Sequence, residues 1–411
     1  MKSRLTALFL LLAAALCTAD ENWPQWRGSE HTGIADGTKM PPLNFSDKEN
    51  VRWSMPIPGR GHGSAMVFGS RVFIAAADEV EKKQWLLCFD RKTGKNLWTK
   101  LVHNGGFPPK SNKKASQASS TPACDGERVI INFLNAGAVH TTAFSLDGMQ
   151  LWQTKISDYV VHQGFSTSPA IYKSLVIVSA DTKIGGTICG LDRKTGNIKW
   201  KVDRPKDPNY TSPMIYKIGG RDQLILQGCR VVTSLDPASG EKIWEHKGST
   251  IECVSSIVTD GKHVFTSGGY DKNHVAAMLA DGSGKVVWEN TSRVYVPSMI
   301  VHDGYLYAIM DNGNAMCWEC ESGEVMWRER LLRTTSATPV MVGDRIYAVD
   351  EGGQFAVIKA DPDNYEVLAK NQLGDQVFST PTICGGEIFV RVAEQVDGKR
   401  KERLYCIGAG N

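Results

Sequence analysis

Two histidines stand in short polar segments whose composition would suit proton transfer or metal binding. His62 lies in Gly61–Ser64, and His162 lies in Val161–Ser166. Histidine changes its charge near neutral pH and is a common metal ligand, so a pair of histidines would suit either chemistry. Both segments also have the composition of loops, which collect polar residues without any function. We therefore favour the interpretation of both as ordinary loop histidines.

Serine and threonine recur just before apolar runs, but they lack the setting of a catalytic nucleophile. A Ser–His–acid hydrolase needs three side chains in a defined geometry, and the Gly-x-Ser-x-Gly turn of one such class does not occur. The hydroxyl residue instead returns eight times, which argues for a structural position. The eight positions lie near Ser64, Thr121, Ser168, Ser212, Ser255, Ser298, Thr338 and Thr380.

Nine of the ten cysteines follow residue 19, and their placement predicts buried thiols rather than disulfides. Several occupy equivalent positions of a repeat, and equivalent residues of different repeats lie apart in a ring. The pair Cys317 and Cys320 has a metal-like spacing, but an offset of three in a strand points the side chains to opposite faces. We therefore predict no metal site. The equivalent cysteines are Cys88, Cys317 and Cys406 at one position, and Cys124 and Cys384 at another.

The elements that position these residues are set by a repeat in which glycine precedes tryptophan by four residues. Successive tryptophans are 54, 48, 44, 44 and 39 residues apart, which indicates one supersecondary unit repeated along the chain. Each unit reads as four short strands with alternating apolar residues, separated by turn residues. We predict an all-β, eight-bladed β-propeller of four-stranded antiparallel blades. The pairs are Gly94/Trp98, Gly148/Trp152, Gly196/Trp200, Gly240/Trp244, Gly284/Trp288 and Gly323/Trp327.

The last two units depart from this pattern. The seventh has Leu368 where tryptophan is expected, and the eighth lacks a fourth strand after Leu404–Ile407. An orphan strand with its own tryptophan, Val51–Ile57, lies near the N-terminus. We predict that it completes the last blade, because this closure removes exposed strand edges. The predicted domains are a signal peptide over 1–19, an irregular extension over 20–50, and the propeller over 51–411.

The first residues are typical of a secretory signal peptide. Basic residues at positions 2 and 4 precede an apolar run over 7–16 and the small-residue cleavage site Cys17–Ala19. The run is too short to span a bilayer as a helix, and a bulky residue before Cys17 argues against a lipoprotein. Cleavage leaves 45 Lys+Arg against 44 Asp+Glu, so the chain lacks the excess of positive charge that is typical of nucleic-acid-binding proteins. We expect a periplasmic or secreted monomer with no transmembrane segment.

The repeat carries a family resemblance. Cys88–Trp98 resembles the tryptophan-docking repeat of pyrroloquinoline-quinone (PQQ) type propellers, Ala-x-Asp-x-x-Thr-Gly-x-x-x-Trp. In that family the tryptophan packs on the turn of a neighbouring blade, so the resemblance implies the same contact here. The segment Asn22–Gly28 is similar to exported planctomycete-type members. The family includes quinoprotein dehydrogenases and the assembly scaffold BamB, so the resemblance alone does not decide the chemistry.

Features that the resemblance would require of a quinoprotein dehydrogenase are missing. The sequence has no adjacent cysteines, no Cys-x-x-Cys-His haem motif and no cluster of oxygen ligands for Ca²⁺. We predict neither PQQ nor Ca²⁺ and interpret the protein as a binding or assembly scaffold without catalytic chemistry, with a protein or peptide partner. Two alternatives stay open: a PQQ-dependent dehydrogenase, and a carbohydrate-active or saccharide-binding propeller.

The predicted interaction surface is a rim formed by the segments that lead into the innermost strands. In propellers these segments surround the mouth of the central channel. They carry His, Tyr and Arg, whereas other turns are mostly Gly, Asp, Lys and Ser. The alternative is that they are unrelated residues of eight separate loops. The predicted rim residues are His62, Gln117, His162, Tyr210, Glu252, Tyr295, Arg333 and Gln376.

Overall fold

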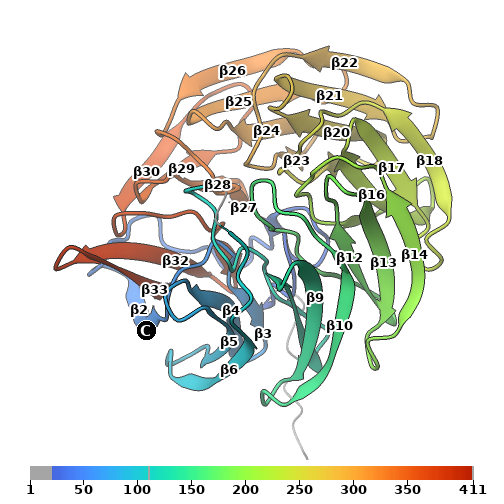
Figure 1. Cartoon of the computed structure of the whole chain (residues 1–411). Coiled ribbons are helices and arrows are strands. Elements are labelled where there is room, and N and C mark those ends of the chain that lie inside the picture. Colours follow the sequence, from blue (N-terminus) through green and yellow to red (C-terminus); the bar gives the residue numbers. More distant parts are fainter. Residues whose placement is uncertain (1–20, 110–111, 410–411) are drawn as a thin grey trace, which may run out of the picture.

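The predicted eight-bladed propeller is confirmed. The computed structural model describes residues 21–109 and 112–409, so the predicted signal peptide and Cys17 lie outside the described residues. Eight sheets follow one another around a central axis in chain order (Figure 1). Their core strands are almost fully buried, because the sheet of each blade packs against the sheets of the neighbouring blades. Within the described part of the chain, no helix has the length and apolarity to cross a membrane.

Each blade is an antiparallel sheet that runs from an innermost to an outermost strand. Blade 1 contains β3 (Met66–Phe68), β4 (Arg71–Asp78), β5 (Lys83–Asp90) and β6 (Asn96–Asn104). Blade 2 contains β7 (Ala123–Cys124), β8 (Arg128–Asn135), β9 (Ala138–Ser145) and β10 (Gln150–Asp158). Blade 3 contains β11 (Ala170–Tyr172), β12 (Leu175–Ala180), β13 (Gly186–Asp192) and β14 (Ile198–Arg204). Blade 4 contains β15 (Met214–Ile218), β16 (Arg221–Gly228), β17 (Val231–Leu235) and β18 (Lys242–Lys247).

The second half of the ring repeats this order. Blade 5 contains β19 (Val258–Thr259), β20 (His263–Gly268), β21 (His274–Leu279) and β22 (Val286–Asn290). Blade 6 contains β23 (Ile300–His302), β24 (Tyr305–Ile309), β25 (Asn314–Glu319) and β26 (Val325–Arg330). Blade 7 contains β27 (Val340–Val342), β28 (Arg345–Val349), β29 (Gln354–Lys359) and β30 (Val367–Gln372), and the short β1 (Ile34–Ala35) pairs in parallel with β27. Blade 8 contains β31 (Thr382–Cys384), β32 (Glu387–Val396), β33 (Lys399–Ile407) and β2 (Val51–Ile57).

Closure of the ring occurs as the sequence predicts. The N-terminal strand β2 pairs antiparallel with β33, and Trp53 lies opposite Cys406. In Figure 1 the blue β2 lies beside the red β32 and β33, at the seam between the two ends of the chain. This pairing gives blade 8 its outermost strand.

The tryptophans dock on the turns of neighbouring blades, which confirms the contact implied by the resemblance. The indole of Trp53 covers Gly94, whose φ is 72°, and a Cβ on that glycine would lie 2.6 Å from the ring. A side chain at this turn would therefore meet both strain and a clash. Five indoles donate to backbone carbonyls of the next blade: Trp53 to Arg91 (2.8 Å), Trp98 to Leu146 (2.9 Å), Trp152 to Arg193 (3.1 Å), Trp288 to Cys320 (2.9 Å) and Trp327 to Asp361 (2.9 Å).

Blade 4 uses a histidine for the same contact. The indole of Trp244 turns to the side chain of Gln223 in its own blade (3.1 Å). His246 Nε2 lies 2.8 Å from the carbonyl oxygen of Gly282 in blade 5, and its ring occupies the space above Gly284. The contact with the turn of the next blade is therefore kept in blade 4, although a histidine makes the hydrogen bond that tryptophan makes elsewhere.

Seven of the eight predicted hydroxyl residues form a belt around the channel, which confirms their structural role, while in blade 5 Ser256 takes the place expected of Ser255. In each bond the backbone N–H of one innermost segment donates to the hydroxyl oxygen of the next blade. This arrangement satisfies a buried backbone donor at the point where a strand begins. The bonds run from Ser64 to Thr121 (3.0 Å), Thr121 to Ser168 (2.9 Å), Ser168 to Ser212 (2.9 Å), Ser256 to Ser298 (2.9 Å), Ser298 to Thr338 (3.0 Å) and Thr338 to Thr380 (2.9 Å).

The cysteines are buried thiols, as the repeat predicts. All nine cysteines of the described residues are free and buried. Burial raises the pKa of the Cys189 thiol to about 12, with Lys201 opposing the effect. Such thiols stay protonated and poorly nucleophilic.

Residues 21–35 of the N-terminal extension have little regular secondary structure beyond the two-residue β1, yet they are bonded closely to the blades. This segment, which we call the floor segment, crosses the end of the channel opposite the mouth. It contacts seven blades, because short stretches of it hydrogen-bond to the innermost strands or to the residues just before them. The contacts are Trp23 with Val67, Pro24 O with Cys124 N, Gln25 Oε1 with Ile171 N, His31 O with Tyr216 OH, Trp26 Nε1 with Ser256 Oγ, Arg27 Nη2 with Met299 O, and β1 with β27.

Candidate binding site at the channel mouth

A cavity of about 570 Å³ lies inside the ring between the mouth and the floor segment. Its size falls within the roughly 300–1,000 Å³ of small-molecule sites. Six aromatic side chains line it together with hydroxyl, amide, imidazole and carboxylate groups. The aromatic residues are Trp26, Phe165, Tyr210, Tyr270, Tyr295 and Phe378.

Glu252 is the carboxylate of this cavity. Its side chain is 5% exposed, and its Oε1 lies 3.0 Å from His162 Nε2. Tyr295 OH lies 3.4 Å from the other carboxylate oxygen. Burial raises the pKa of Glu252, while His162 and Tyr295 oppose that shift by stabilising the charged form. The backbone around Glu252 is held in place by an antiparallel bridge between Glu252 and Tyr270.

Tyr210 and Tyr295 present phenol groups to the same space. Tyr210 is 5% exposed, and its hydroxyl oxygen accepts the backbone N–H of Gln163 at 3.1 Å. Tyr295 N donates to Asp311 Oδ2 at 2.7 Å, which anchors the backbone of its segment. Burial raises the pKa of both phenols, so both stay neutral and keep a proton to donate.

Side chains of distant blades meet across the mouth. Lys114, between β6 and β7, places Nζ 2.7 Å from Glu351, which lies between β28 and β29. Ser336 Oγ donates to the same carboxylate at 2.6 Å. Asn112 Nδ2 donates to Gln163 Oε1 at 2.9 Å. The connection after blade 1 is therefore tied to blades 3 and 7.

The opposite wall is aromatic. His62 stacks on Phe378 with ring centroids 4.6 Å apart and an interplanar angle of 25°. Trp26 of the floor segment reaches the cavity from below, and its Nε1 donates to Ser256 Oγ at 2.9 Å. One end of the chain therefore supplies a wall of a site that is otherwise built by the blades.

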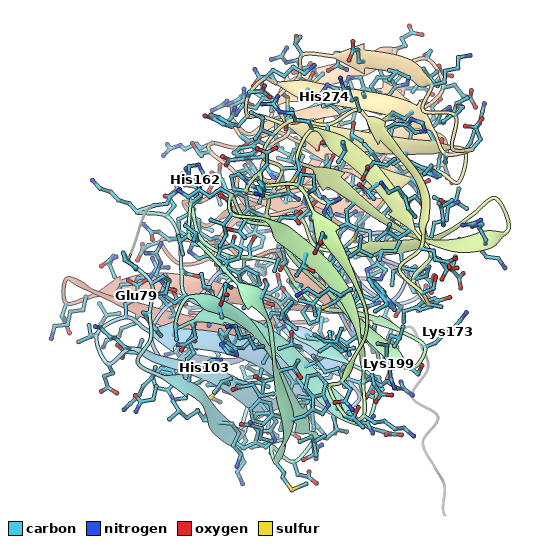
Figure 2. All side chains as sticks on the ribbon, turned by 45° about the vertical axis from the view of Figure 1, so that its right-hand side comes forward. Glu79, His103, His162, Lys173, Lys199 and His274 are labelled. Atoms are coloured by element: carbon cyan, nitrogen blue, oxygen red, sulfur yellow. The ribbon has the colours of Figure 1, made fainter. Side chains whose placement is uncertain are left out.

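Five of the eight predicted rim residues line this cavity. His162 lies on the connection between β10 and β11, outside the strands (Figure 2). The other three lie around it: Gln117 lines an adjoining hollow of about 20 Å³, Arg333 is exposed, and Gln376 pairs its backbone with Ala393. The five cavity residues are His62, His162, Tyr210, Glu252 and Tyr295.

Sequence analysis missed Trp26, Lys114, Phe165 and Phe378. Phe165 and Phe378 stand in the same lead-in segments as the rim residues, so a search for all aromatics in those segments would have found them. Trp26 and Lys114 carry no such signal, because they belong to no repeat position. The interpretation of His162 as an ordinary loop residue also did not anticipate its pairing with Glu252.

The cavity contains one acid–base pair and few charges. A glycoside hydrolase of the common type needs two carboxyl groups flanking the bond, and among the described lining residues Glu252 is the one carboxylate. The hydroxyl belt offers no nucleophile paired with a histidine, because its oxygens accept backbone N–H groups. The geometry suits recognition better than either reaction.

The lining also does not fit PQQ with Ca²⁺. Ca²⁺ takes six to eight oxygen ligands, several of them carboxylates. No group of three or more His, Cys, Asp or Glu residues suited to a metal occurs among the described residues. PQQ is a tricarboxylate, yet Glu252 faces the cavity and Lys114 is already paired with Glu351.

Sequence comparison relates the chain to outer membrane assembly factors. The family model described as outer membrane protein assembly factor BamB matches residues 45–159, 82–329, 271–367 and 321–400. The outer membrane protein assembly factor BamB of Moranella endobia (strain PCIT) is 23% identical over 380 residues, which cover 86% of this chain and 90% of the relative.

Solved structures share the fold at low identity. A europium-containing methanol dehydrogenase superposes with a TM-score of 0.70 at 11% identity and covers 95% of this chain and 98% of its own. BamB from Moraxella catarrhalis superposes with a TM-score of 0.62 at 13% identity and covers 86% of this chain and 98% of its own. These likenesses show the propeller fold alone, since the same fold hosts different functions.

Proposed function

The chain belongs to the family of the outer membrane protein assembly factor BamB, and from that premise we propose that it is an exported binding scaffold in outer-membrane protein assembly. It acts in the periplasm, binds a polypeptide partner and carries out no reaction of its own. The observation that carries this proposal is the extent of the likeness, which spans 86% of this chain and 90% of the Moranella relative.

The mouth is the face that we propose for the partner. Exposed Arg333 and the half-exposed His162 surround an opening that also carries Tyr295. Tyrosine and arginine are enriched in binding hot spots. The belt and the floor segment hold this face on a rigid ring, which limits the entropy lost on binding.

Site-specific cross-linking in the encoding organism tests the proposal. A photo-reactive amino acid at position 333 should cross-link to a component of the outer-membrane assembly machinery or to an unfolded outer-membrane protein. The same amino acid at position 199, on the outer strand β14, is the matched control because its side chain is 54% exposed. Cross-links of equal identity and yield from both positions, or from neither, would refute the mouth as the docking face.

Loss of the protein provides the second readout. Deletion of the gene should lower the amounts of β-barrel proteins in the outer membrane, and wild-type protein should restore them. Normal β-barrel amounts in the deletion strain would contradict the assembly role.

The likeness to methanol dehydrogenase favours a quinoprotein as the second candidate function, and the misfit of the lining opposes it. We propose that the protein uses neither PQQ nor Ca²⁺. Incubation with PQQ and Ca²⁺, followed by alcohol- or sugar-dependent dye reduction, should give no turnover above background. Clear turnover would replace the scaffold by a dehydrogenase.

A further inference from the structure

The belt that joins the blades leaves a set of hydroxyl protons facing the cavity. Thr121, Ser212, Thr338 and Thr380 line it, and each hydroxyl oxygen accepts a backbone N–H at 2.9 or 3.0 Å. Among the described residues, none of these four hydroxyls donates its own proton to another residue. A hydroxyl has one donor and two acceptor positions, so each keeps an O–H group for a molecule inside the ring.

Acceptors stand beside these donors. The Glu252 carboxylate and the Tyr210 hydroxyl oxygen line the same cavity, as do the amide groups of Asn112 and Gln163. Tyr210 stays neutral and its hydroxyl oxygen accepts from Gln163, so its own proton is a further donor, whereas Tyr295 OH donates to Glu252. A ligand here meets both hydrogen-bond donors and acceptors.

Aromatic faces complete the lining from several sides. The stacked His62 and Phe378 form one wall, Trp26 comes from the floor segment, and Phe165 and Tyr295 come from other blades. Lys114 is paired with Glu351 and His162 with Glu252, so the lining presents little unpaired charge.

We propose that this cavity is a binding site for a short neutral saccharide, of the size of a disaccharide or trisaccharide. A sugar ring has a C–H face that stacks on aromatic rings and an edge of hydroxyls that donate and accept together. An apolar ligand would leave the hydroxyl protons and Glu252 without partners, which carries a desolvation cost. A polyanion would meet the Glu252 carboxylate.

Calorimetric titration tests the inference. The probes are neutral disaccharides and trisaccharides of glucose, galactose, mannose, xylose and N-acetylglucosamine, in both α and β linkages. At least one should bind at concentrations up to millimolar and shift the tryptophan fluorescence through Trp26. Absence of binding by every member of this panel overturns the proposal.

Substitutions place the ligand in the cavity. Glu252→Gln should weaken binding roughly tenfold to a hundredfold, because a charged hydrogen-bond acceptor is lost while the shape is kept. Phe378→Ala should weaken it as well by removing a stacking face. Lys199→Ala is the control, since Lys199 lies on the outer strand β14, its side chain is 54% exposed, and it does not line the cavity. Unchanged affinity in folded Glu252→Gln protein would move the site elsewhere and overturn the proposal.

A mild variant guards against loss of folding. Trp26→Phe should keep the ring closed and the saccharide bound while the ligand-dependent fluorescence shift disappears. A full shift in this variant would show that the saccharide does not reach the floor segment, which contradicts the proposed site.

Two sources of the saccharide are separated by a sedimentation assay with cellulose, chitin and peptidoglycan sacculi. A site for free oligosaccharides binds the soluble probes and leaves the protein in the supernatant of every polymer. If the site binds polymer ends, the wild-type protein should sediment with one of the three polymers, and the Glu252→Gln protein should not. The inference does not rest on the assembly role: a Glu252→Gln strain with normal outer-membrane β-barrel amounts but no saccharide binding would separate the two.

Discussion

The floor and the mouth of the channel are built by opposite means. The floor is one continuous segment, and Trp23, Gln25, Arg27 and His31 within it are each at most 6% exposed. The mouth is assembled from separate connections that meet through half-exposed side-chain pairs such as Lys114 with Glu351. Buried bonds of the floor to backbone groups fix the relative position of the blades, whereas the mouth leaves side chains free to contact a ligand. We infer that the floor contributes stability and the mouth contributes recognition.

The largest effect should follow removal of the N-terminal elements. A mature chain that begins at residue 58 lacks both the floor segment and β2, so β33 becomes an exposed edge. We expect loss of the cooperative thermal transition and aggregation, measured by circular dichroism and light scattering. A truncated chain that melts like the full protein would show that neither element closes the ring.

Arg27→Ala should be the most harmful single change in the floor. The Arg27 guanidinium donates to the carbonyl oxygens of His31 (3.0 Å), Thr32 (2.5 Å) and Met299 (2.7 Å), and the side chain is 2% exposed. Truncation leaves the carbonyl oxygens of Thr32 and Met299 without the Arg27 donor, while that of His31 still accepts from Tyr216 OH, and it creates a cavity, at a cost of about 3 kcal/mol. Chemical denaturation measures this difference. A loss below about 0.5 kcal/mol would remove the distinction between floor and mouth.

Tyr210→Ala tests the comparison at the mouth, where we expect a destabilisation as large as that in the floor. This rim residue is 5% exposed, and its backbone is tied to Cys253 at 3.0 Å. The loss should approach the roughly 3–5 kcal/mol of buried aromatic truncations. A triple change of Tyr210, Tyr295 and Arg333 to alanine is therefore unsuitable for testing binding, because loss of the buried Tyr210 ring would also destabilise the fold. Tyr210→Phe is the control that keeps the ring.

Acid should loosen the floor before the mouth. His31 accepts from Gln25 at 3.2 Å and lies 3.3 Å from the Trp26 carbonyl oxygen, to which its other nitrogen donates, so the ring is neutral. Burial lowers the pKa of His31 to about 4 from the ordinary 6.5, and Arg27 adds to the shift. The unfolded chain then takes up the proton first, so stability falls as pH drops from about 6.5 to 4, by about 3 kcal/mol.

Hydrogen exchange at residues 25–33 measures this local loss. A local readout is needed because burial also lowers the pKa of His103 to about 4, and that residue lies at the seam of blades 1 and 2. His31→Gln should flatten the pH dependence of exchange in the floor. The same slope in the variant would mean that another group is responsible.

Arg333→Ala should have the smallest effect. The side chain is exposed, and surface substitutions of this kind usually stay within about 0.5 kcal/mol. Its backbone N–H, which donates to Asp350 at 3.3 Å, is unchanged by the substitution. Thermal melting should therefore coincide with that of the wild type. A clear destabilisation would show that exposed residues of the mouth also contribute to the stability of the ring.

The sequence by itself determined the fold, because a propeller repeats local rules. Turn glycines such as Gly94, docking tryptophans and hydroxyl residues return at fixed positions, and the orphan strand around Trp53 matches the missing strand of blade 8. These features are local in sequence, so their period reveals the architecture. The lead-in segments also pointed to the channel mouth, and five of the eight rim residues meet in one cavity.

Only the tertiary structure decided what the non-repeating residues do. The contact of Trp26 with Ser256 joins residues 230 apart, the His162–Glu252 pair joins blades 3 and 5, and Lys114 meets Glu351 across the mouth. No period encodes such contacts, since each occurs once and depends on how the closed ring brings distant connections together. The ring creates the cavity, and its closure sets which unique side chains face one another inside it.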